Sequence, residues 1–422
     1  MVVSPQVEME APVKGIRLAG LIGIPVLIAF LIKGLSSISS VPLVFAVGGL
    51  FATLLIATSI TLDILRQRFD LFNHKYYALA GLFTFLVVGM VKSLWIYEEP
   101  VTDDLQTAVK AALLVNLSIG AFLIGNALPF RGVVRNEVVV ISKRRLFAIS
   151  ALYALLGSYV FSVYVTTAGE EELSNAFLWF GHLAPVGAIL GIFLLLTYRL
   201  KATLLFTIPA MAFSLLVGSR TPLMYIFFFA AAYAIYLRYG GRPRFEPKVL
   251  AVLALFLAVS LFAGSALKTV VGTGWQVSDL KDFTVATGHR IQTLEFIDAF
   301  DNLCRILELY VDQGLYLYGW SLAAALLNFI PRGLWPDKPY SLGKLLVQDL
   351  TGETELTGTS FAPSLLGELV ANFGPLAGPM GYFVFGMLAR LLYGRFRGLE
   401  HDSPYAILYL MSFVLLFLES RG

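Results

Sequence analysis

The sequence is poor in charged residues, which make up only 14% of its 422 positions. A soluble domain of this length carries far more charge to cover its surface. Hydrophobic residues make up 58% of the chain, and the mean hydropathy is +0.77. Apolar runs of about 20 residues recur, which is the length a helix needs to cross a hydrocarbon core of roughly 30 Å. The composition therefore favours one polytopic membrane domain over two or three soluble ones.

Cysteine and other ligand-forming patterns are scarce. Cys304 is the single cysteine, which excludes an intrachain disulfide framework. There is no phosphate-binding glycine loop, no histidine or cysteine cluster at metal-ligand spacing and no nucleophilic serine motif. The basic residues are scattered between apolar runs, so the net charge of +3 does not indicate nucleic-acid binding. These absences predict no metal, no other cofactor and no nucleic-acid partner.

Apolar segments of membrane-crossing length are what the chain contains instead. They predict an all-α polytopic membrane protein with roughly 11 transmembrane helices and a large, partly helical periplasmic loop. The expected spans are 18–32, 41–62, 77–97, 108–130, 146–166, 175–198, 202–217, 222–237, 249–267, 375–393 and 404–418. The first of these follows a polar start without a small-residue cleavage pattern, so we expect it to remain as an anchor.

The charges between the spans indicate an orientation. Every second connection is basic, and these connections contain Arg66, Arg131, Arg199, Arg238 and Arg395. The intervening connections are acidic or neutral, notably 98–104 and 170–172. Because basic connections face the cytoplasm, the N-terminus is expected inside, and the turn 218–221 is expected on the outer face.

Three parts of the single membrane domain follow from this alternation: N-terminal helices (1–267), the large outer loop (268–364) and C-terminal helices (365–422). Within the loop, apolar residues at spacings of three and four over 290–312 predict an amphipathic helix. We expect that helix to lie on the membrane surface.

Shorter elements are expected nearer the end of the loop. The apolar stretch 321–330 is too short to span, so it is expected to be interfacial or re-entrant. Short helices are predicted over 341–350 and 364–373, each beginning at a serine that can cap it. Gly374 and Pro375 then break the path.

Two outer-face arginines stand out as candidates for binding an anion. Guanidinium groups bind phosphate oxygens at two points and stay charged. Arg332 follows Pro331 in a loop stiffened by further prolines, so its side chain can be aimed in advance. Arg220 lies in a tight turn before Pro222. The alternatives are a solvated loop arginine for Arg332 and an interfacial arginine reaching lipid phosphates for Arg220.

Other candidates share the outer face with them. Glu368 is a carboxylate in an otherwise apolar helix, which is costly unless it is paired or functional. His289 and Arg290 lie where the amphipathic helix begins, and His289 can serve as a base, as a phosphate donor or as a surface cap. Lys338 and Arg421 are weaker candidates for phosphate binding, with loop or interfacial roles as the alternative. We expect Lys92, Lys110 and His182 to be structural or cavity-lining, and Asp103 and Asp104 to form a solvated acidic loop.

The sequence 330–339, IPRGLWPDKP, followed by Gly367–Glu368–Leu369 and Asn372–Phe373–Gly374, resembles the signature of bacterial O-antigen polymerases, the Wzy-type oligosaccharide repeat-unit polymerases. The spacing from Arg332 to Gly343 matches the arginine and glycine of that family's large periplasmic loop. The turn containing Arg220 resembles the family's earlier outer-face arginine but has no glycine at the matching distance.

The resemblance implies a metal-independent, inverting glycosyltransferase of the bacterial inner membrane, with a fold similar to the C-type integral-membrane glycosyltransferases. Such an enzyme moves a growing glycan from one undecaprenyl diphosphate onto another lipid-linked repeat unit. Arg220, Arg332 and Arg290, with Lys338 and Arg421, would bind diphosphate, and Glu368 or His289 would act on the acceptor hydroxyl. Membrane lipid, a chain-length regulator and a flippase are the expected partners.

Two other functions fit the same topology. An O-antigen ligase transfers finished polymer to a lipid core. A flippase or exporter of lipid-linked oligosaccharide moves its substrate without chemistry, and it requires polar residues through the spans, whereas here they gather on one side.

Overall fold

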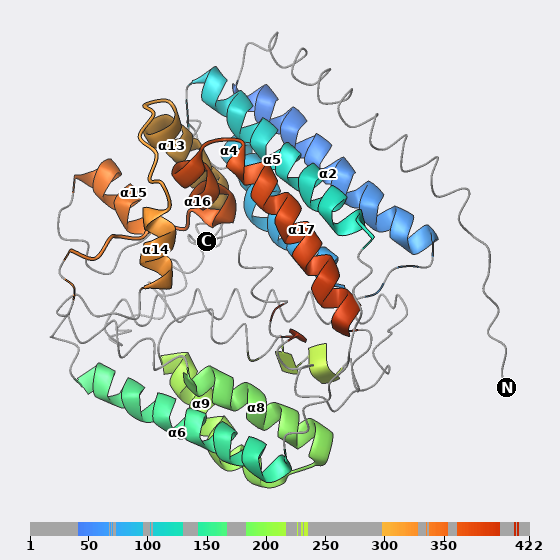
Figure 1. The fold of residues 1–422 in the computed structure, drawn as a ribbon, viewed down its shortest axis with the longest axis vertical. Helices are drawn as coiled ribbons and strands as arrows, with labels where there is room; N and C mark the ends of the chain where they lie inside the picture. The colour runs from blue at the N-terminus through green and yellow to red at the C-terminus, as the bar shows by residue number, and fades with distance from the viewer. Residues whose placement is uncertain are drawn as a thin grey trace.

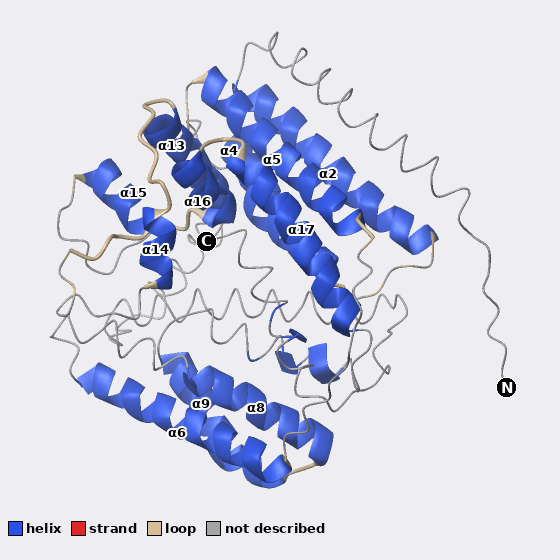
Figure 2. Ribbon diagram, viewed as in Figure 1, coloured by secondary structure: helices blue, strands red, loops and turns tan. Residues whose placement is uncertain are grey.

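The computed structural model describes residues 41–66, 68, 70, 73–95, 102, 104–129, 142–166, 183–216, 226, 229–230, 232–234, 298–327, 335, 337–352, 361–396, 409–410 and 412. Every regular element in these ranges is a helix (Figure 2), and none of the described residues forms a strand. The expected all-α class is therefore confirmed for this part of the chain.

Three long helices form the main bundle: α2 (Val41–Leu65), α5 (Leu105–Ala127) and α17 (Ala377–Phe396). They lie side by side (Figure 1), with α5 packed against both α2 and α17. A fourth segment consists of α3 (His74–Gly81), the π-helix η1 (Leu82–Val87) and α4 (Val88–Trp95), and it packs against the same three helices. The bundle thus joins the N-terminal helices to a helix from the end of the chain.

Backbone contact between α5 and α17 depends on two glycines. A Cβ added at Gly125 would lie 2.1 Å from the carbonyl oxygen of Phe383, and one added at Gly386 would lie 2.2 Å from that of Phe122. The Asn126 side-chain amide donates to the Gly386 carbonyl at 3.3 Å. Small residues that let helix backbones touch, with an amide bonding across the contact, are typical of helix packing in membranes.

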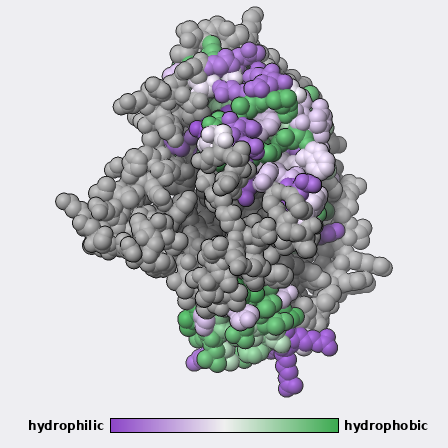
Figure 3. Space-filling model, turned by 90° about the vertical axis from the view of Figure 1, so that its left-hand side faces the viewer, coloured by the Kyte–Doolittle hydropathy of each residue, from purple (hydrophilic) through white to green (hydrophobic). Residues whose placement is uncertain are grey.

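A second group contains α6 (Lys143–Thr166), α8 (Leu183–Tyr198), the short η2 (Lys201–Thr203) and α9 (Leu204–Leu216). Helices α6, α8 and α9 pack against one another below the main bundle in Figure 1. The Ser150 hydroxyl of α6 donates to the Gly187 carbonyl of α8 at 2.9 Å. Hydrophobic side chains dominate the lower part of the view in Figure 3, where this group lies, whereas polar and apolar side chains mix in the upper part.

Five short elements gather at one end of the main bundle, near the start of α5 (Figure 1). They are α13 (Ala299–Ile306), the π-helix η3 (Leu307–Val311), α14 (Trp320–Leu326), α15 (Leu342–Thr351) and α16 (Ser364–Phe373). The last two match the predicted short helices, and α14 begins the stretch expected to be too short to span. Gly374 ends α16 with φ at +88°, which confirms the predicted break.

Membrane-crossing length and composition are met by two of the described helices, α2 and α5. The expected count of roughly 11 is therefore not reached within the described ranges. The segment expected to span over 77–97 is a run of three helical pieces with a π-helix in its middle. The described part of the span expected over 175–198 is helix α8 from Leu183, and α9 has 13 residues with Pro209 inside it. The spans expected at 18–32 and 249–267 lie outside the described residues.

The amphipathic segment expected on the membrane surface is instead buried where it is described. Its helix α13 packs between α4, α5 and α16, and Phe300, Leu303 and Leu307 are fully buried in the main core. The sequence pattern indicated polar faces, but one of its polar residues, Asp301, is buried as well, because Lys92 of α4 pairs with it at 3.2 Å. A buried ion pair thus allows the helix to be covered on several sides.

Candidate functional site

Two of the seven predicted site residues, Glu368 and Lys338, lie within the described part of the chain. Arg220, His289, Arg290, Arg332 and Arg421 lie outside it, so their convergence on one site stays a prediction. Glu368 has hydrogen-bond partners from two helices among the described residues.

Helix α16 positions Glu368 by burying its neighbours. Leu366 and Val370 are fully buried in the main core, and a Cβ added at Gly367 would lie 2.7 Å from Ile306 of α13. At its start, Ser364 accepts a hydrogen bond from the backbone N–H of Gly367 at 3.2 Å, so its hydroxyl stabilises the first turn as the sequence predicted. With one face of α16 fixed against α13, Glu368 is presented toward α14.

Glu368 is bound by neutral donors in the described structure. The Ser321 hydroxyl of α14 donates to Glu368 Oε2 at 2.5 Å. The Asn372 side-chain amide donates to Ser321 Oγ at 2.6 Å and to the Glu368 backbone carbonyl at 2.7 Å, with Oε2 further away at 3.4 Å. These three residues, called here the Glu368 triad, form a continuous hydrogen-bonded group between α14 and α16.

Burial controls the protonation of this carboxyl group. Desolvation raises the pKa of Glu368 above its usual value, while the hydrogen bonds from Ser321 and Asn372 oppose that rise. A carboxylate with a raised pKa is a better proton acceptor than an exposed one, provided that it is still ionised at the working pH. The triad therefore has the chemistry of a general base that is held in one orientation.

Asn372 also fixes the loop that leads into α14. Its Oδ1 accepts from the backbone N–H of Gly319 at 2.8 Å, and its backbone carbonyl accepts from Tyr318 at 3.1 Å. Tyr318 has φ at +48°, a region that residues with side chains rarely adopt. Backbone strain of this kind persists only where the surroundings impose it and is frequent at functional sites. One asparagine thus links the strained loop to the carboxylate.

Lys338 is 6% exposed, so it is not the flexible, solvated loop lysine that the alternative described. Its backbone N–H donates to the Trp335 carbonyl at 3.1 Å in a tight turn. A buried lysine needs a specific partner, since desolvating an ammonium group is costly. Whether that partner is ever a phosphate stays a prediction.

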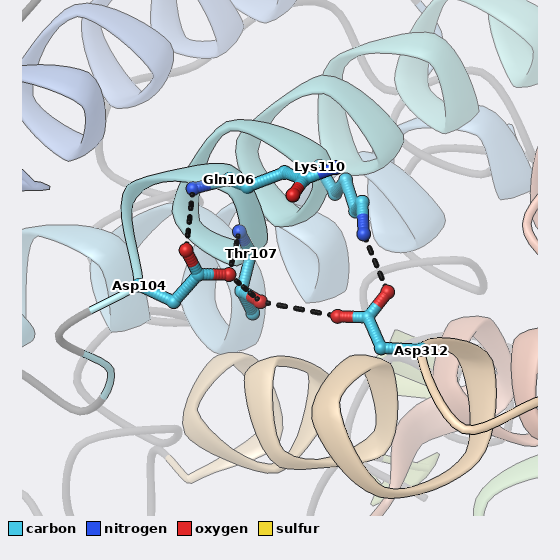
Figure 4. A network of polar contacts seen from close by, with 5 residues as sticks. All are labelled: Asp104, Gln106, Thr107, Lys110 and Asp312. Carbon is cyan, nitrogen blue, oxygen red and sulfur yellow. Dashed lines mark hydrogen bonds and ion pairs between the residues drawn. The ribbon is translucent and has the colours of Figure 1, made fainter.

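Acidic partners for two lysines escaped the sequence reasoning. Lys92 pairs with Asp301, and Lys110 pairs with Asp312 of the turn after η3 (Figure 4). The Thr107 hydroxyl lies between Asp312, at 3.4 Å, and Asp104, at 2.7 Å. Both lysines thus have the structural role that was expected of them.

Asp104 lies at the end of the acidic connection and caps α5. Its carboxylate accepts from the backbone N–H groups of Gln106 and Thr107 (Figure 4). Hydrogen bonds from Thr107 are the main reason that the pKa of Asp104 is lowered. The solvated loop expected here is therefore, at this residue, an exposed helix cap.

Ser321 and Asn372 are the site residues that the sequence reasoning missed. Asn372 had a visible signal, because it lies one helical turn after Glu368 and so shares its face. Ser321 had none, since it is far from Glu368 in the chain and only the packing of α14 against α16 brings it there.

With the fold and the triad described, the class of protein can be stated. The described residues form an all-helical protein in which α2 and α5 are long and apolar enough to cross a membrane. No family model matches the chain, and no solved structure matches it. Any finer assignment is therefore a proposal from its own residues.

Proposed function

We propose that this protein is a polysaccharide polymerase of the bacterial inner membrane. It would transfer a growing glycan from one undecaprenyl-diphosphate carrier onto the sugar end of another lipid-linked repeat unit. The observation that carries the proposal is the Glu368 triad: a half-buried carboxylate held by a hydroxyl and an amide at one end of a helical bundle, with its pKa raised by desolvation.

The chemistry assigns Glu368 the role of general base. The acceptor hydroxyl oxygen attacks the anomeric carbon of the donor sugar, and its proton passes to the Glu368 carboxylate. The bond between that carbon and the diphosphate oxygen breaks, and the carrier diphosphate leaves with the electron pair. Attack opposite the leaving group inverts the anomeric centre, and no metal takes part in this scheme.

Negative charge develops on the departing diphosphate, so fixed cations are needed beside it. Arg220, Arg332 and Arg290 are proposed for that role, with Lys338 and Arg421 as further candidates. The support is their placement on the outer side in the orientation that the basic connections predict, which is also the side assigned to Glu368.

Purified protein in lipid vesicles, incubated with a lipid-linked repeat unit, tests the proposal. A ladder of products differing by one repeat is expected, and unchanged substrate would overturn it. A ligase would add one block to a different acceptor without a ladder, and a flippase would move the substrate across the bilayer unchanged.

Arg332→Lys provides a sharper test of the diphosphate site. The substitution keeps the charge but loses the two-point geometry, so polymerisation is expected to fall by about tenfold or more. Arg305→Lys is a suitable control, because the Arg305 guanidinium packs over the Phe361 ring in the described structure, 5.2 Å from its centre. Full activity in Arg332→Lys would reduce Arg332 to an ordinary loop residue.

A further inference from the structure

Four aromatic side chains crowd the surface beside the Glu368 triad. Tyr318, Trp320 and Phe373 are 76%, 59% and 54% exposed, and Tyr316 is half-buried next to them. The rings of Tyr316 and Tyr318 meet edge to face, with centroids 6.4 Å apart. We call Tyr316, Tyr318, Trp320 and Phe373 the aromatic rim. Large exposed aromatic side chains gathered in one place mark an interaction surface.

Contacts through two glycines make the rim continuous across two segments of the chain. A Cβ at Gly319 would lie 3.6 Å from the Phe373 ring, and one at Gly374 would lie 3.5 Å from the Tyr316 ring. Both glycines have positive φ, at +91° and +88°, a backbone conformation that glycine adopts readily, so each segment turns tightly beside a rim residue of the other. The loop before α14 and the end of α16 thus form one surface.

An aliphatic stripe begins where the rim ends. Leu376, Met380, Val384, Leu388 and Leu392 follow one another at intervals of four, and all are exposed or nearly so. This spacing places them along one face of α17, opposite the buried residues that pack against α5. The described residues therefore leave this face of α17 exposed.

Polar residues precede the rim in the chain. Asp312 and Gln313 are exposed and lie just before Leu315 and the first rim tyrosine. In chain order, the exposed residues of these segments therefore change from polar (312–313), through aromatic (316–320 and 373), to aliphatic (376–392). The same order runs from water through the headgroups to the acyl chains of a bilayer, where tyrosine and tryptophan are enriched at the boundary.

The length of α17 fits the same partner. From Leu376 to Arg395 the chain advances 19 positions, or about 28 Å at the helical rise, close to the roughly 30 Å of a hydrocarbon core. Arg395 follows the last stripe residue, Leu392, at the far end of the helix, where a long cationic side chain can reach lipid phosphates. The stripe is thus bounded by aromatic residues at one end and by an arginine at the other.

We propose that the aromatic rim lies at the boundary between headgroups and acyl chains of a phospholipid bilayer, with the stripe of α17 facing the acyl chains. Because Ser321 follows Trp320 directly and Asn372 precedes Phe373, this placement holds the Glu368 triad at headgroup depth. The inference rests on exposure and packing alone and does not require the proposed glycosyl transfer.

Depth-dependent quenching of Trp320 fluorescence tests the placement. Trp95, Trp179, Trp275 and Trp335 are replaced by Phe, and the protein is reconstituted in phosphatidylcholine vesicles containing lipids with a nitroxide near the headgroup or near the chain end. The shallow probe is expected to quench Trp320 about twofold more than the deep probe. Equal or stronger quenching by the deep probe would overturn the proposal.

Val384→Trp in the same background, with Trp320→Phe, is the matched control, since Val384 lies mid-stripe and is expected to reverse the order of the probes. Strong quenching of Trp320 by aqueous acrylamide, with none by either lipid probe, would also overturn the inference and indicate a solvated surface for a glycan or protein.

Should the multiple variant fold poorly, Trp320→Phe alone in the natural chain is compared with wild type. It is expected to remove signal that only the shallow probe quenches, and its failure to do so counts against the proposal. The test uses no sugar substrate, so its failure is distinguishable from failure of the polymerase proposal.

Discussion

Two neighbouring short helices, α13 and α16, each carry an acidic side chain that is withdrawn from solvent, fully for Asp301 and partly for Glu368, and the two acids are bound by different partners. Asp301 of α13 pairs with the Lys92 ammonium of α4, and the exposed fractions of the two side chains are 7% and 1%. Glu368 of α16 receives only a hydroxyl and an amide from the described residues. One acid is therefore held by a full opposite charge and the other by dipoles.

This difference in partners indicates different roles for the two acidic residues, a structural role for Asp301 and a role in proton transfer for Glu368. A buried pair with a cation resists change, because removing either charge leaves the other desolvated and alone. A carboxyl group held by neutral donors can gain or lose a proton without stranding a partner charge. We therefore assign Asp301 to the packing of the fold and Glu368 to the proposed chemistry.

Breaking the structural pair is expected to have the largest effect. Lys92→Met removes the cation that pairs with the buried Asp301 carboxylate, which is expected to destabilise the protein by about 3–5 kcal/mol. Thermal unfolding in detergent, followed by circular dichroism, measures the loss. The double variant Lys92→Met with Asp301→Leu is the control and is expected to recover most of the stability. An unchanged melting temperature in the single variant would contradict the role given to this pair.

Glu368→Gln is expected to cause a large loss of activity with little change in stability, in contrast to the loss of stability expected for Lys92→Met. Glutamine keeps the size and the hydrogen-bonding oxygen but does not accept the acceptor's proton, so polymerisation should fall about 100-fold or more. The melting temperature should stay constant or rise slightly at neutral pH, since no charge is then buried. Full product ladders from this variant would remove Glu368 from the mechanism.

Ser321→Ala is expected to change the pH dependence of activity more than its maximum. A base must be ionised, so activity is lost as the pH falls through the raised pKa of Glu368. Removing the Ser321 hydroxyl takes away a donor that favours the ionised form, so the pKa rises further and the acidic limb moves to higher pH. The limb is read from initial rates of glycan extension across pH. Ser158→Ala, on α6, is the control and should leave it in place.

The smallest effect is expected for the exposed counterpart of the buried pair. Lys110 and Asp312 are each about one-third exposed, with side-chain values of 31% and 34%. Asp312→Asn should therefore change the free energy of unfolding by less than about 1 kcal/mol, and less still at high salt. A loss as large as that for Lys92→Met would show that burial does not distinguish the two pairs.

Several of the described helices were predictable, because apolar runs and helix-breaking residues in the sequence indicate where such helices lie. The bounds of α16 agree with the expected segment, since an apolar run and the Gly374 break define them. The interruption of the third expected span by η1 was not predictable, because a π-helix preserves the apolar character of the run.

Side-chain partners were harder to predict, because they are set by contacts between distant segments and not by the local sequence pattern. Glu368 was identified because a carboxylate among apolar residues demands an explanation. The hydrogen bond from Ser321 to Glu368 and the pairing of Lys92 with Asp301 both join segments that are far apart in the chain. The periodicity of a sequence does not show such contacts. The amphipathic pattern of this segment predicted a helix on the membrane surface. Such a pattern shows which faces of a helix are polar, but it does not show that a buried cation, Lys92, pairs with Asp301 on one of those faces.

The glycine contact between α5 and α17 has a consequence for biosynthesis. Helix α5 is made before α17, so the surface around Gly125 is completed only when α17 has been made. Helix α16, which carries Glu368, immediately precedes α17 and docks beside it. Glu368 is consequently made long after α5, so a nascent chain stalled between α5 and α16 holds its early helices without the group that we propose acts on sugars.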